Sequence, residues 1–108
     1  MKIAYTVRCA FDSEKVAQAW MEWLETEHLR DVCEAGALSG EGVWLDGEGL
    51  PEGQAICVAR YIFDSRRAFD DYIEKHAPRL RQEGLSKFPL DLGLSYYRTV
   101  GEIRSTHA

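Results

Sequence analysis

Two adjacent polar residues, Glu27 and His28, close a stretch that is otherwise rich in tryptophan and aliphatic side chains, AWMEWLETEH over residues 19–28. On a helical wheel of ~100° per residue, Glu27 falls between Trp20 and Trp23, and His28 lies beside the aliphatic residues of the same face. If the helix is intact there, both polar groups point at the core or at its margin.

A carboxyl group and an imidazole in such surroundings can exchange a proton. Burial among indoles raises the pKa of a carboxyl group, and a nearby imidazole can hold it charged or share its proton. Glu27 and His28 are therefore our candidate catalytic residues. A structural alternative stays open, in which the helix ends near His28, Glu27 sits at a solvated margin, and His28 caps carbonyls or makes one structural hydrogen bond.

The helix that carries these residues follows a predicted strand. Residues 3–11 alternate apolar with other side chains, which is the period of a strand. Asp12 or Ser13 can accept the free N–H groups of the first helical turn. Apolar residues at three-and-four spacing continue from there, and Gly36 is a natural stop.

Two further strands are predicted in the middle of the chain. Residues 37–45 read as a strand weakened by Gly40 and Gly42, and such glycines often mark a bulge or a sheet edge. The acidic D-G and L-P-E-G sequences that follow predict a hairpin turn. Residues 54–63 are apolar on both alternating sides, which is typical of a central strand covered on both faces.

A second helix and a last strand complete the chain. Ser65 can cap the helix, and its apolar stripe includes His76. Pro78 cannot donate to Glu74, so a break is predicted near His76 with a restart at Pro78. Residues 92–103 supply a fourth strand.

The order strand, helix, strand, strand, helix, strand is the ferredoxin-like pattern of the α+β class, a four-stranded antiparallel sheet with two helices on one face. We expect one such domain over residues 1–104 and a frayed tail at 105–108. This fold leaves one face of the sheet open, yet residues 54–63 predict cover on both. A homodimer formed through the open face, giving a dimeric α/β barrel, resolves the conflict.

Four segments resemble a known family: WMEWLETEHLRDVCEAGAL, RYIF, YIEKHAPRLRQEGLSKFP and YYRTVGEI. They are similar to the bacterial domain-of-unknown-function family four-two-eight-six, and the likeness covers nearly the whole chain except the acidic hairpin tip. That family resembles the dimeric ferredoxin-like α/β barrels, so the resemblance implies this fold and a dimer. Related barrels include cofactor-independent monooxygenases, haem-degrading monooxygenases, lactone isomerases and small-ligand sensor domains, so the fold alone does not choose a function.

Aromatic residues and a second histidine are the candidate ligand-binding positions: Tyr5, Trp20, Trp23, Tyr61 and His76. The resemblance makes His76 a possible haem ligand, because haem-degrading relatives bind iron through a helical histidine. Those relatives also use an asparagine on a strand, and this chain contains no asparagine. We therefore expect neither haem nor another cofactor.

No metal site is predicted. His28 and His76 lie near the C-terminal ends of antiparallel helices, roughly 20 Å apart for strands of this length, which is too far for two ligands of one ion. Cys9, Cys33 and Cys57 are widely spaced and form no C-x-x-C motif, so we expect buried thiols rather than a disulfide framework.

Basic and aromatic residues on the strands offer a further site. Arg8, Arg60 and Arg98 lie on three neighbouring strands and could bind an anion or acids of a partner subunit if they share a face. Independent surface positions are the alternative, because register cannot be read from sequence. Four tyrosines could line a pocket between sheet and helices or simply fill the core: Tyr5, Tyr61, Tyr96 and Tyr97.

Composition narrows the classes of partner. The net charge is -5 and no dense stripe of lysine and arginine is present, which excludes nucleic acid and anionic membranes. No run approaches the ~20 apolar residues that span a bilayer, and we expect a cytoplasmic location.

The sequence is compatible with three functional hypotheses. The leading hypothesis is a small homodimeric barrel protein that binds a small apolar or aromatic molecule or acts as an accessory protein. The alternative is an enzyme of the cofactor-independent monooxygenase or isomerase type, with Glu27, His28 and Trp23 at its site. Haem binding through His76 is the second alternative.

Overall fold

The central strands of the sheet are the two most apolar ones. The computed structural model describes residues 1–108 and contains one four-stranded sheet in the order β2-β3-β1-β4 with antiparallel pairing throughout. Its strands are β1 (Ile3–Phe11), β2 (Ala37–Trp44), β3 (Ala55–Phe63) and β4 (Leu94–Glu102). This arrangement is the predicted ferredoxin-like fold, and the two-sided apolar pattern of β3 agrees with its interior position.

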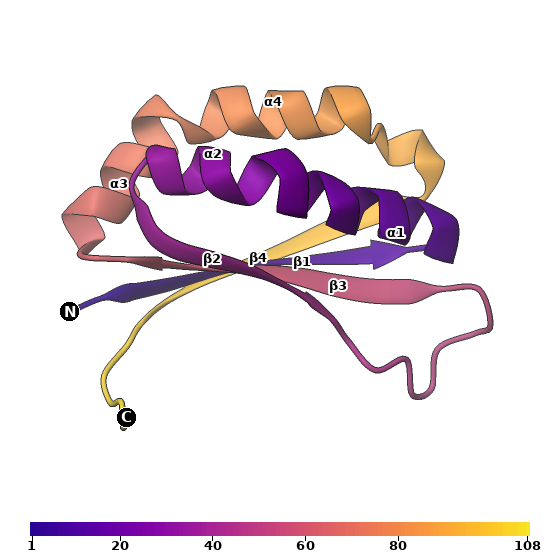
Figure 1. The fold of residues 1–108 in the computed structure, drawn as a ribbon, viewed down its shortest axis with the longest axis horizontal. Coiled ribbons are helices and arrows are strands. Elements are labelled where there is room, and N and C mark those ends of the chain that lie inside the picture. Colours follow the sequence, from indigo (N-terminus) through magenta and orange to yellow (C-terminus); the bar gives the residue numbers. More distant parts are fainter.

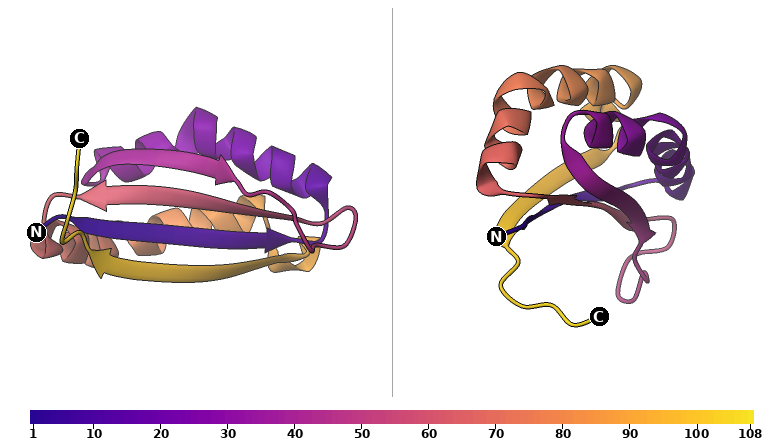
Figure 2. Two further views of the ribbon diagram at one scale, coloured as in Figure 1. Left: turned by 90° about the horizontal axis from the view of Figure 1, so that it is seen from below. Right: turned by 60° about the vertical axis from the view of Figure 1, so that its left-hand side comes forward.

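Both helical segments cover the same face of the sheet (Figures 1 and 2). The first runs through α1 (Glu14–Trp23), η1 (Leu24–His28) and α2 (Leu29–Glu34), and the second through α3 (Arg66–Lys75), α4 (Ala77–Lys87) and the short η2 (Leu90–Leu92). Serine hydroxyls cap the first helix of each segment as predicted. Ser13 Oγ accepts the N–H of Val16 at 3.4 Å, and Ser65 Oγ accepts that of Ala68 at 3.1 Å.

The predicted break in the second helical segment is confirmed. His76 has φ -123° and ψ -37°, which interrupts the helix, and α4 begins at Ala77 with Pro78 in its first turn. Proline is tolerated there because the first-turn N–H groups have no partner within the helix.

None of the helices combines the length and the apolar character that crossing a membrane requires.

The glycines of β2 serve close packing. The strand lies at the edge of the sheet as predicted, but its irregularity falls between Ala37 and Ser39 instead of at Gly40 or Gly42. A Cβ at Gly42 would lie 3.1 Å from Met21 Cε. These glycines therefore leave room for the helix above β2, and this packing was not visible in the strand pattern.

The register of the sheet answers whether the three strand arginines share a face. Thr6 pairs with Arg60, and the next residue, Val7, pairs with Arg98. Successive strand residues point to opposite faces, so Arg98 lies on the helix-covered face while Arg8 and Arg60 lie on the other one. Arg60 forms an ion pair there with Glu41 of β2.

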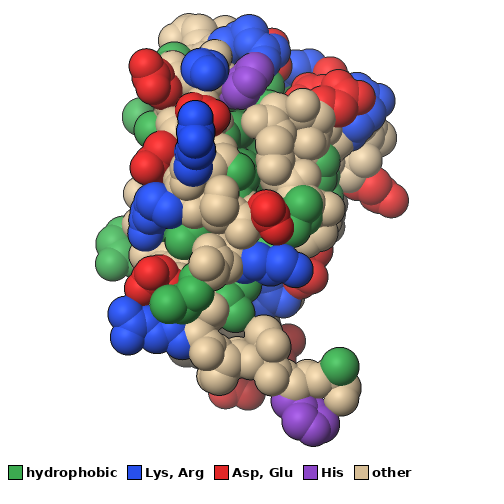
Figure 3. All heavy atoms as spheres, turned by 90° about the vertical axis from the view of Figure 1, so that its left-hand side faces the viewer, with side chains coloured by type: hydrophobic (Ala, Val, Ile, Leu, Met, Phe, Trp, Pro, Cys, Tyr) green, Lys and Arg blue, Asp and Glu red, His purple; other side chains and the backbone are tan.

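The helix-free face of the sheet, called the open face below, carries a mixed set of side chains. Alternation from the paired register assigns to it Ala4, Ala10, Val43, Ile56, Val58, Ile62 and Tyr97, together with Arg8, Arg60 and Glu41. Tyr97 is 66 % exposed. Figure 3 shows a different side of the molecule, the left-hand end of Figure 1, where basic and acidic side chains are mixed.

Two of the three cysteines face each other in the core. Cys9 of β1 pairs with Cys57 of β3, both side chains are buried, and all three cysteines are free thiols. Burial raises the pKa of Cys9 to about 12 and that of Cys57 to about 11, so both stay protonated. The prediction of buried thiols holds for these two, whereas Cys33 is only half-buried.

Candidate functional site

The segment LETEH, which the sequence marks as unusual, forms one π-helical turn. Residues Leu24–His28 make up η1, and the N–H of Leu29 bonds to the carbonyl of Leu24, five residues earlier. Thr26 contributes locally, because its hydroxyl donates to the carbonyl oxygen of Glu22 at 2.9 Å. Such back-bonding bends helices, and single π turns recur at functional sites.

The π turn decides which polar residue enters the core. In an uninterrupted α-helix Glu27 would lie within about 40° of Trp23 around the axis. The extra residue of the π turn moves His28 into that position and turns Glu27 toward the helix margin. Glu27 therefore lies at a solvated margin, as the structural alternative has it, and its carboxylate pairs with Lys87 Nζ at 3.2 Å and is 46 % exposed.

His28 is stacked on an indole and has no hydrogen-bond partner at Nδ1. Its ring lies on Trp23 with centroids 4.2 Å apart and planes at 20°. Nδ1 is buried and unpaired, so His28 neither caps a carbonyl through this atom nor pairs with Glu27. Burial lowers the pKa of His28 to about 4, Asp31 opposes this, and Arg98 adds to it. The imidazole is therefore neutral at neutral pH.

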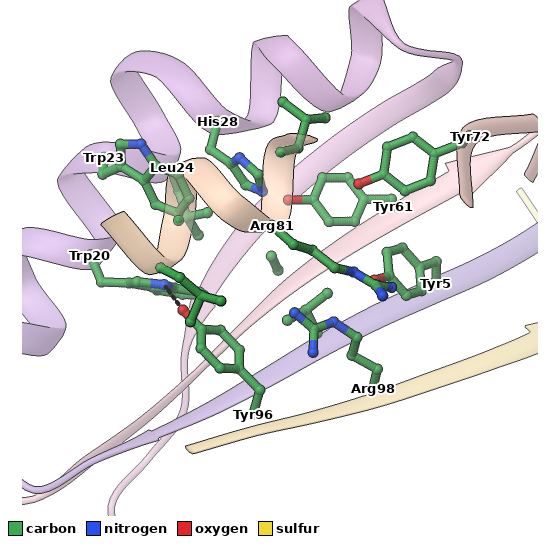
Figure 4. Close-up of a pocket in the computed structure, with 15 residues that line it drawn as sticks. Tyr5, Trp20, Trp23, Leu24, His28, Tyr61, Tyr72, Arg81, Tyr96 and Arg98 are labelled. Carbon is green, nitrogen blue, oxygen red and sulfur yellow. Dashed lines mark hydrogen bonds between the residues drawn. The ribbon is translucent and has the colours of Figure 1, made fainter. Parts of the chain in front are cut away.

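A cavity of about 160 Å³ lies between the sheet and the helices beside His28. Tyrosine and tryptophan rings form a large part of its wall, as Figure 4 shows. The lining residues are Tyr5, Val7, Trp20, Trp23, Leu24, His28, Ala59, Tyr61, Tyr72, Leu80, Arg81, Gly84, Leu85, Tyr96 and Arg98. No aspartate or glutamate is among them.

Two buried polar atoms of this wall lack partners. They are His28 Nδ1 and the hydroxyl of Tyr61, a residue that is 1 % exposed. Burial raises the pKa of Tyr61, so its hydroxyl keeps its proton and can donate it in a hydrogen bond. In Figure 4 the two side chains approach each other, one from η1 and one from β3. An unpaired buried polar group costs about 1 to 3 kcal/mol, and a bound molecule that pairs with either atom removes part of that cost.

The exposed members of the lining mark the mouth of the cavity. They are Arg81 and Leu85 of α4 and Arg98 of β4. Arg81 donates to the hydroxyl of Tyr5 at 3.2 Å, and the guanidinium of Arg98 lies 5.0 Å from the ring centre of Tyr96. The hydroxyl of Tyr96 in turn accepts the indole N–H of Trp20 at 3.2 Å.

Four of the five candidate ligand-binding residues come together in this cavity. Tyr5, Trp20, Trp23 and Tyr61 line it, whereas His76 lies outside it. His76 is half-buried at the break in the helix, with Nδ1 3.4 Å from the guanidinium of Arg79, and it borders a shallow pocket with Asp31 and Glu34 of α2. No group of three or more histidine, cysteine, aspartate or glutamate side chains could hold a metal ion.

Sequence reasoning missed Arg81, although a signal for it exists. The buried residues of α4 are Ala77, Leu80 and Gly84, and Arg81 lies four residues after the first of them. A cation on the apolar stripe of a helix points toward the core or its edge. Gly84 lets α4 pack closely against the Trp23 ring, because a Cβ at this position would lie 3.3 Å from that ring.

The fold and its cavity define a ferredoxin-like protein with an aromatic-walled site under its helices. The family model for "Domain of unknown function (DUF4286)" matches residues 2–94, so the chain belongs to this family. No curated protein matches the chain.

Solved structures share the fold at low sequence identity. A dimeric ferredoxin-like protein from an uncultured marine organism is similar at TM-score 0.72 and 17 % identity over 98 % of each chain. HapK from Hahella chejuensis has TM-score 0.64 and 14 % identity over 100 % of this chain and 98 % of its own. SnoaB, a cofactor-independent oxygenase from Streptomyces nogalater, has TM-score 0.59 and 11 % identity over 97 % and 95 %. At these identities the likeness establishes the fold alone.

Proposed function

We propose that this protein binds a small aromatic or apolar molecule, about one ring in size, in the cavity between the sheet and the helices. The volume of about 160 Å³ is close to the roughly 150 Å³ of an apolar protein cavity that accepts benzene. Indole and phenol rings form the wall, and a flat ligand stacks well on them.

The observation that carries the proposal is the pair of unpaired polar atoms in a mostly apolar wall. A cavity that served only as a packing defect would gain nothing from burying His28 Nδ1 and the Tyr61 hydroxyl without partners. Ligand sites, in contrast, combine an apolar lining with a few polar atoms that fix orientation.

Filling the cavity tests the proposal. Single-ring compounds at about ten times their dissociation constant should raise the melting temperature of the wild type by several degrees, because a ligand stabilises by RT ln(1 + [L]/Kd). Val7→Phe places a ring inside the cavity and should abolish the increase. Val100→Phe, on an exposed residue outside the lining, is the matched control and should keep it.

Either of two results would count against the binding proposal. One is a panel of ring compounds that leaves the melting temperature unchanged, which would favour the accessory-protein alternative. The other is an increase that survives Val7→Phe, because the compound would then bind elsewhere.

We propose further that two copies pair through the open face. The apolar residues Val43, Ile56 and Ile62 share that face with the exposed ring of Tyr97. Exposed apolar patches of this kind mark interaction surfaces, and a two-fold axis lets one patch cover itself. Support also comes from the similar ferredoxin-like protein described above, which is dimeric.

Sedimentation of a charged variant tests the dimer. The wild type at micromolar concentration should sediment at twice the chain mass of 12.3 kDa. Tyr97→Asp places a carboxylate in the interface and should shift the protein to a folded monomer. Its melting temperature should be lower than that of the wild type, because association stabilises the folded chain. Leu90→Asp, which changes a 56 % exposed apolar residue away from the sheet, should remain dimeric. A wild type of single-chain mass would refute the pairing.

Cofactor-independent oxygenation is the second candidate function. It is favoured by the neutral imidazole of His28, whose free Nδ1 can accept a proton or hydrogen bond from a bound molecule. A pKa of about 4 makes His28 a weak base, which favours binding over proton abstraction. Oxygen uptake upon adding a compound that binds, lost in His28→Phe, would establish the enzyme. The haem alternative gains no support, since His76 lies outside the cavity.

A further inference from the structure

We infer that the bound molecule is an aromatic carboxylate, with its ring inside the cavity and its carboxylate at the mouth between Arg81 and Arg98. This inference rests on the proposed binding function and adds the charge and the orientation of the ligand. Its basis is the absence of any acidic partner for two arginines that share one site.

Arg81 and Arg98 have no carboxylate partner, although the chain has a surplus of acids. The protein holds 18 acidic and 13 basic side chains, so carboxylates are not scarce. Arg30, Arg60 and Arg104 each pair with a carboxylate within 4.0 Å, whereas the other arginines do not. Arg81 and Arg98 differ from the other unpaired arginines in that both line one cavity. Two cations with aromatic neighbours only, at the mouth of one cavity, lack the anion that such guanidinium groups bind best.

The guanidinium groups of Arg81 and Arg98 both lie between the rings of Tyr5 and Tyr96 in Figure 4. Arg98 pairs with Val7 across β1 and β4, and Arg81 bonds the hydroxyl of Tyr5. Tyr5 and Val7 lie two residues apart on one face of β1, a spacing of roughly 7 Å. Figure 4 shows both arginine side chains reaching toward this region from α4 and β4.

Donors are free on both arginines. A guanidinium has five N–H donors, and Arg81 uses one of them on Tyr5. Arg98 stacks near Tyr96 and makes no hydrogen bond to a protein side chain. Both can therefore donate to a carboxylate, and their positive charges repel each other until an anion arrives.

The opposite side of the cavity is polar but uncharged. The Tyr61 hydroxyl and His28 Nδ1 come from β3 and η1, and β3 is separated from β4 by β1, roughly 10 Å across two strand spacings. A ring with a carboxylate at one end and a hydroxyl at the other spans such a site. A hydroxylated benzoate is therefore the ligand shape that pairs with all four groups.

Matched probes separate the charge from the ring. We would titrate the wild type with 4-hydroxybenzoate, with the neutral 4-hydroxybenzamide and with inorganic phosphate, following tryptophan fluorescence and melting temperature. The acid should bind roughly ten- to a hundredfold more tightly than the amide, which is the range for charge-assisted hydrogen bonds. Phosphate, which lacks the ring, should bind more weakly than the acid.

Variants that remove a charge test whether the tighter binding of the acid depends on the two arginines at the mouth of the cavity. Arg81→Gln and Arg98→Gln should each weaken binding of 4-hydroxybenzoate about tenfold or more and change binding of the amide by less than about threefold. Arg67→Gln removes an exposed charge from α3, outside the cavity, and should leave both affinities unchanged.

The outcomes separate the inference from the binding proposal. If the amide binds as tightly as the acid, or if the acid-to-amide ratio survives both cavity arginine variants, the carboxylate inference is wrong while ring binding stands. If phosphate matches the acid, the mouth is a general anion site and the oriented aromatic acid is refuted. If neither ring compound binds, the binding proposal and the inference fall together.

Discussion

Acidification from pH 6.5 to pH 4 should lower the free energy of unfolding of the wild type by up to roughly 3 kcal/mol more than it lowers that of His28→Phe. Phenylalanine keeps the stack on Trp23 and removes the titrating nitrogen. Urea denaturation at a series of pH values measures the difference.

The direction follows from the two pKa values of His28. Its pKa is about 4 in the folded protein and 6.5 as the ordinary value, so between these limits the unfolded chain binds the proton and the native chain does not. The contribution of neutral His28 is fully present above pH 6.5 and is lost as the pH falls through that window. Asp and Glu groups also titrate near its lower end, which is why the comparison is made with the variant.

At neutral pH the same variant should be as stable as the wild type or about 1 kcal/mol more stable, because it removes a buried nitrogen without a partner. His107→Phe, in the exposed C-terminal segment, is the control and should retain the full acid sensitivity of the wild type. Equal acid sensitivity in wild type and His28→Phe would refute the burial of a neutral imidazole. A clear loss of stability at neutral pH would restore the structural role for His28.

Deletion of Thr26 should leave the protein folded and within about 1 kcal/mol of wild-type stability, whereas deletion of Gln18 should lower the melting temperature by roughly 10 °C or prevent folding. The reason lies in the π turn. Without Thr26 the bond from Leu29 N–H to Leu24 C=O spans four residues, so a regular α-helix results and His28 stays over Trp23.

Gln18 is the matched control because it lies in the regular helix α1. Its loss rotates the residues before it by ~100° relative to those after it, so Ala17 and Trp20 cannot both remain buried. Circular dichroism melts of the two deletions give the comparison. Equal damage by both would show that the Leu24–His28 turn does not hold one surplus residue.

Periodicity could predict the elements of the fold because the relevant interactions are local. Ser13 and Ser65 cap helices with hydroxyls three residues from their N–H donors, and Pro78 ends hydrogen bonding within its own turn. The apolar pattern of β3 on both sides also predicted its interior place in the sheet.

The site could be predicted only in part, because its members meet through register and one irregular turn. Tyr5 and Tyr61 are partners across β1 and β3, a pairing that strand patterns do not specify. Because of the π turn, His28 and not Glu27 lies over Trp23. A helical wheel is drawn for a regular α-helix and therefore does not show this change. Arg81 was visible in principle, as a cation on the apolar stripe of α4.

The most direct test of a ligand-binding cavity is the response of the three tryptophan indole N–H signals in a two-dimensional NMR spectrum of the nitrogen-15-labelled protein. The titrant is the ring compound that raises the melting temperature most. Trp20 and Trp23 line the cavity, and Trp44 lies outside it on β2. We expect saturable shifts of the Trp20 and Trp23 signals and no change of the Trp44 signal. Shifts confined to Trp44, or no shift at saturating compound, would contradict this expectation.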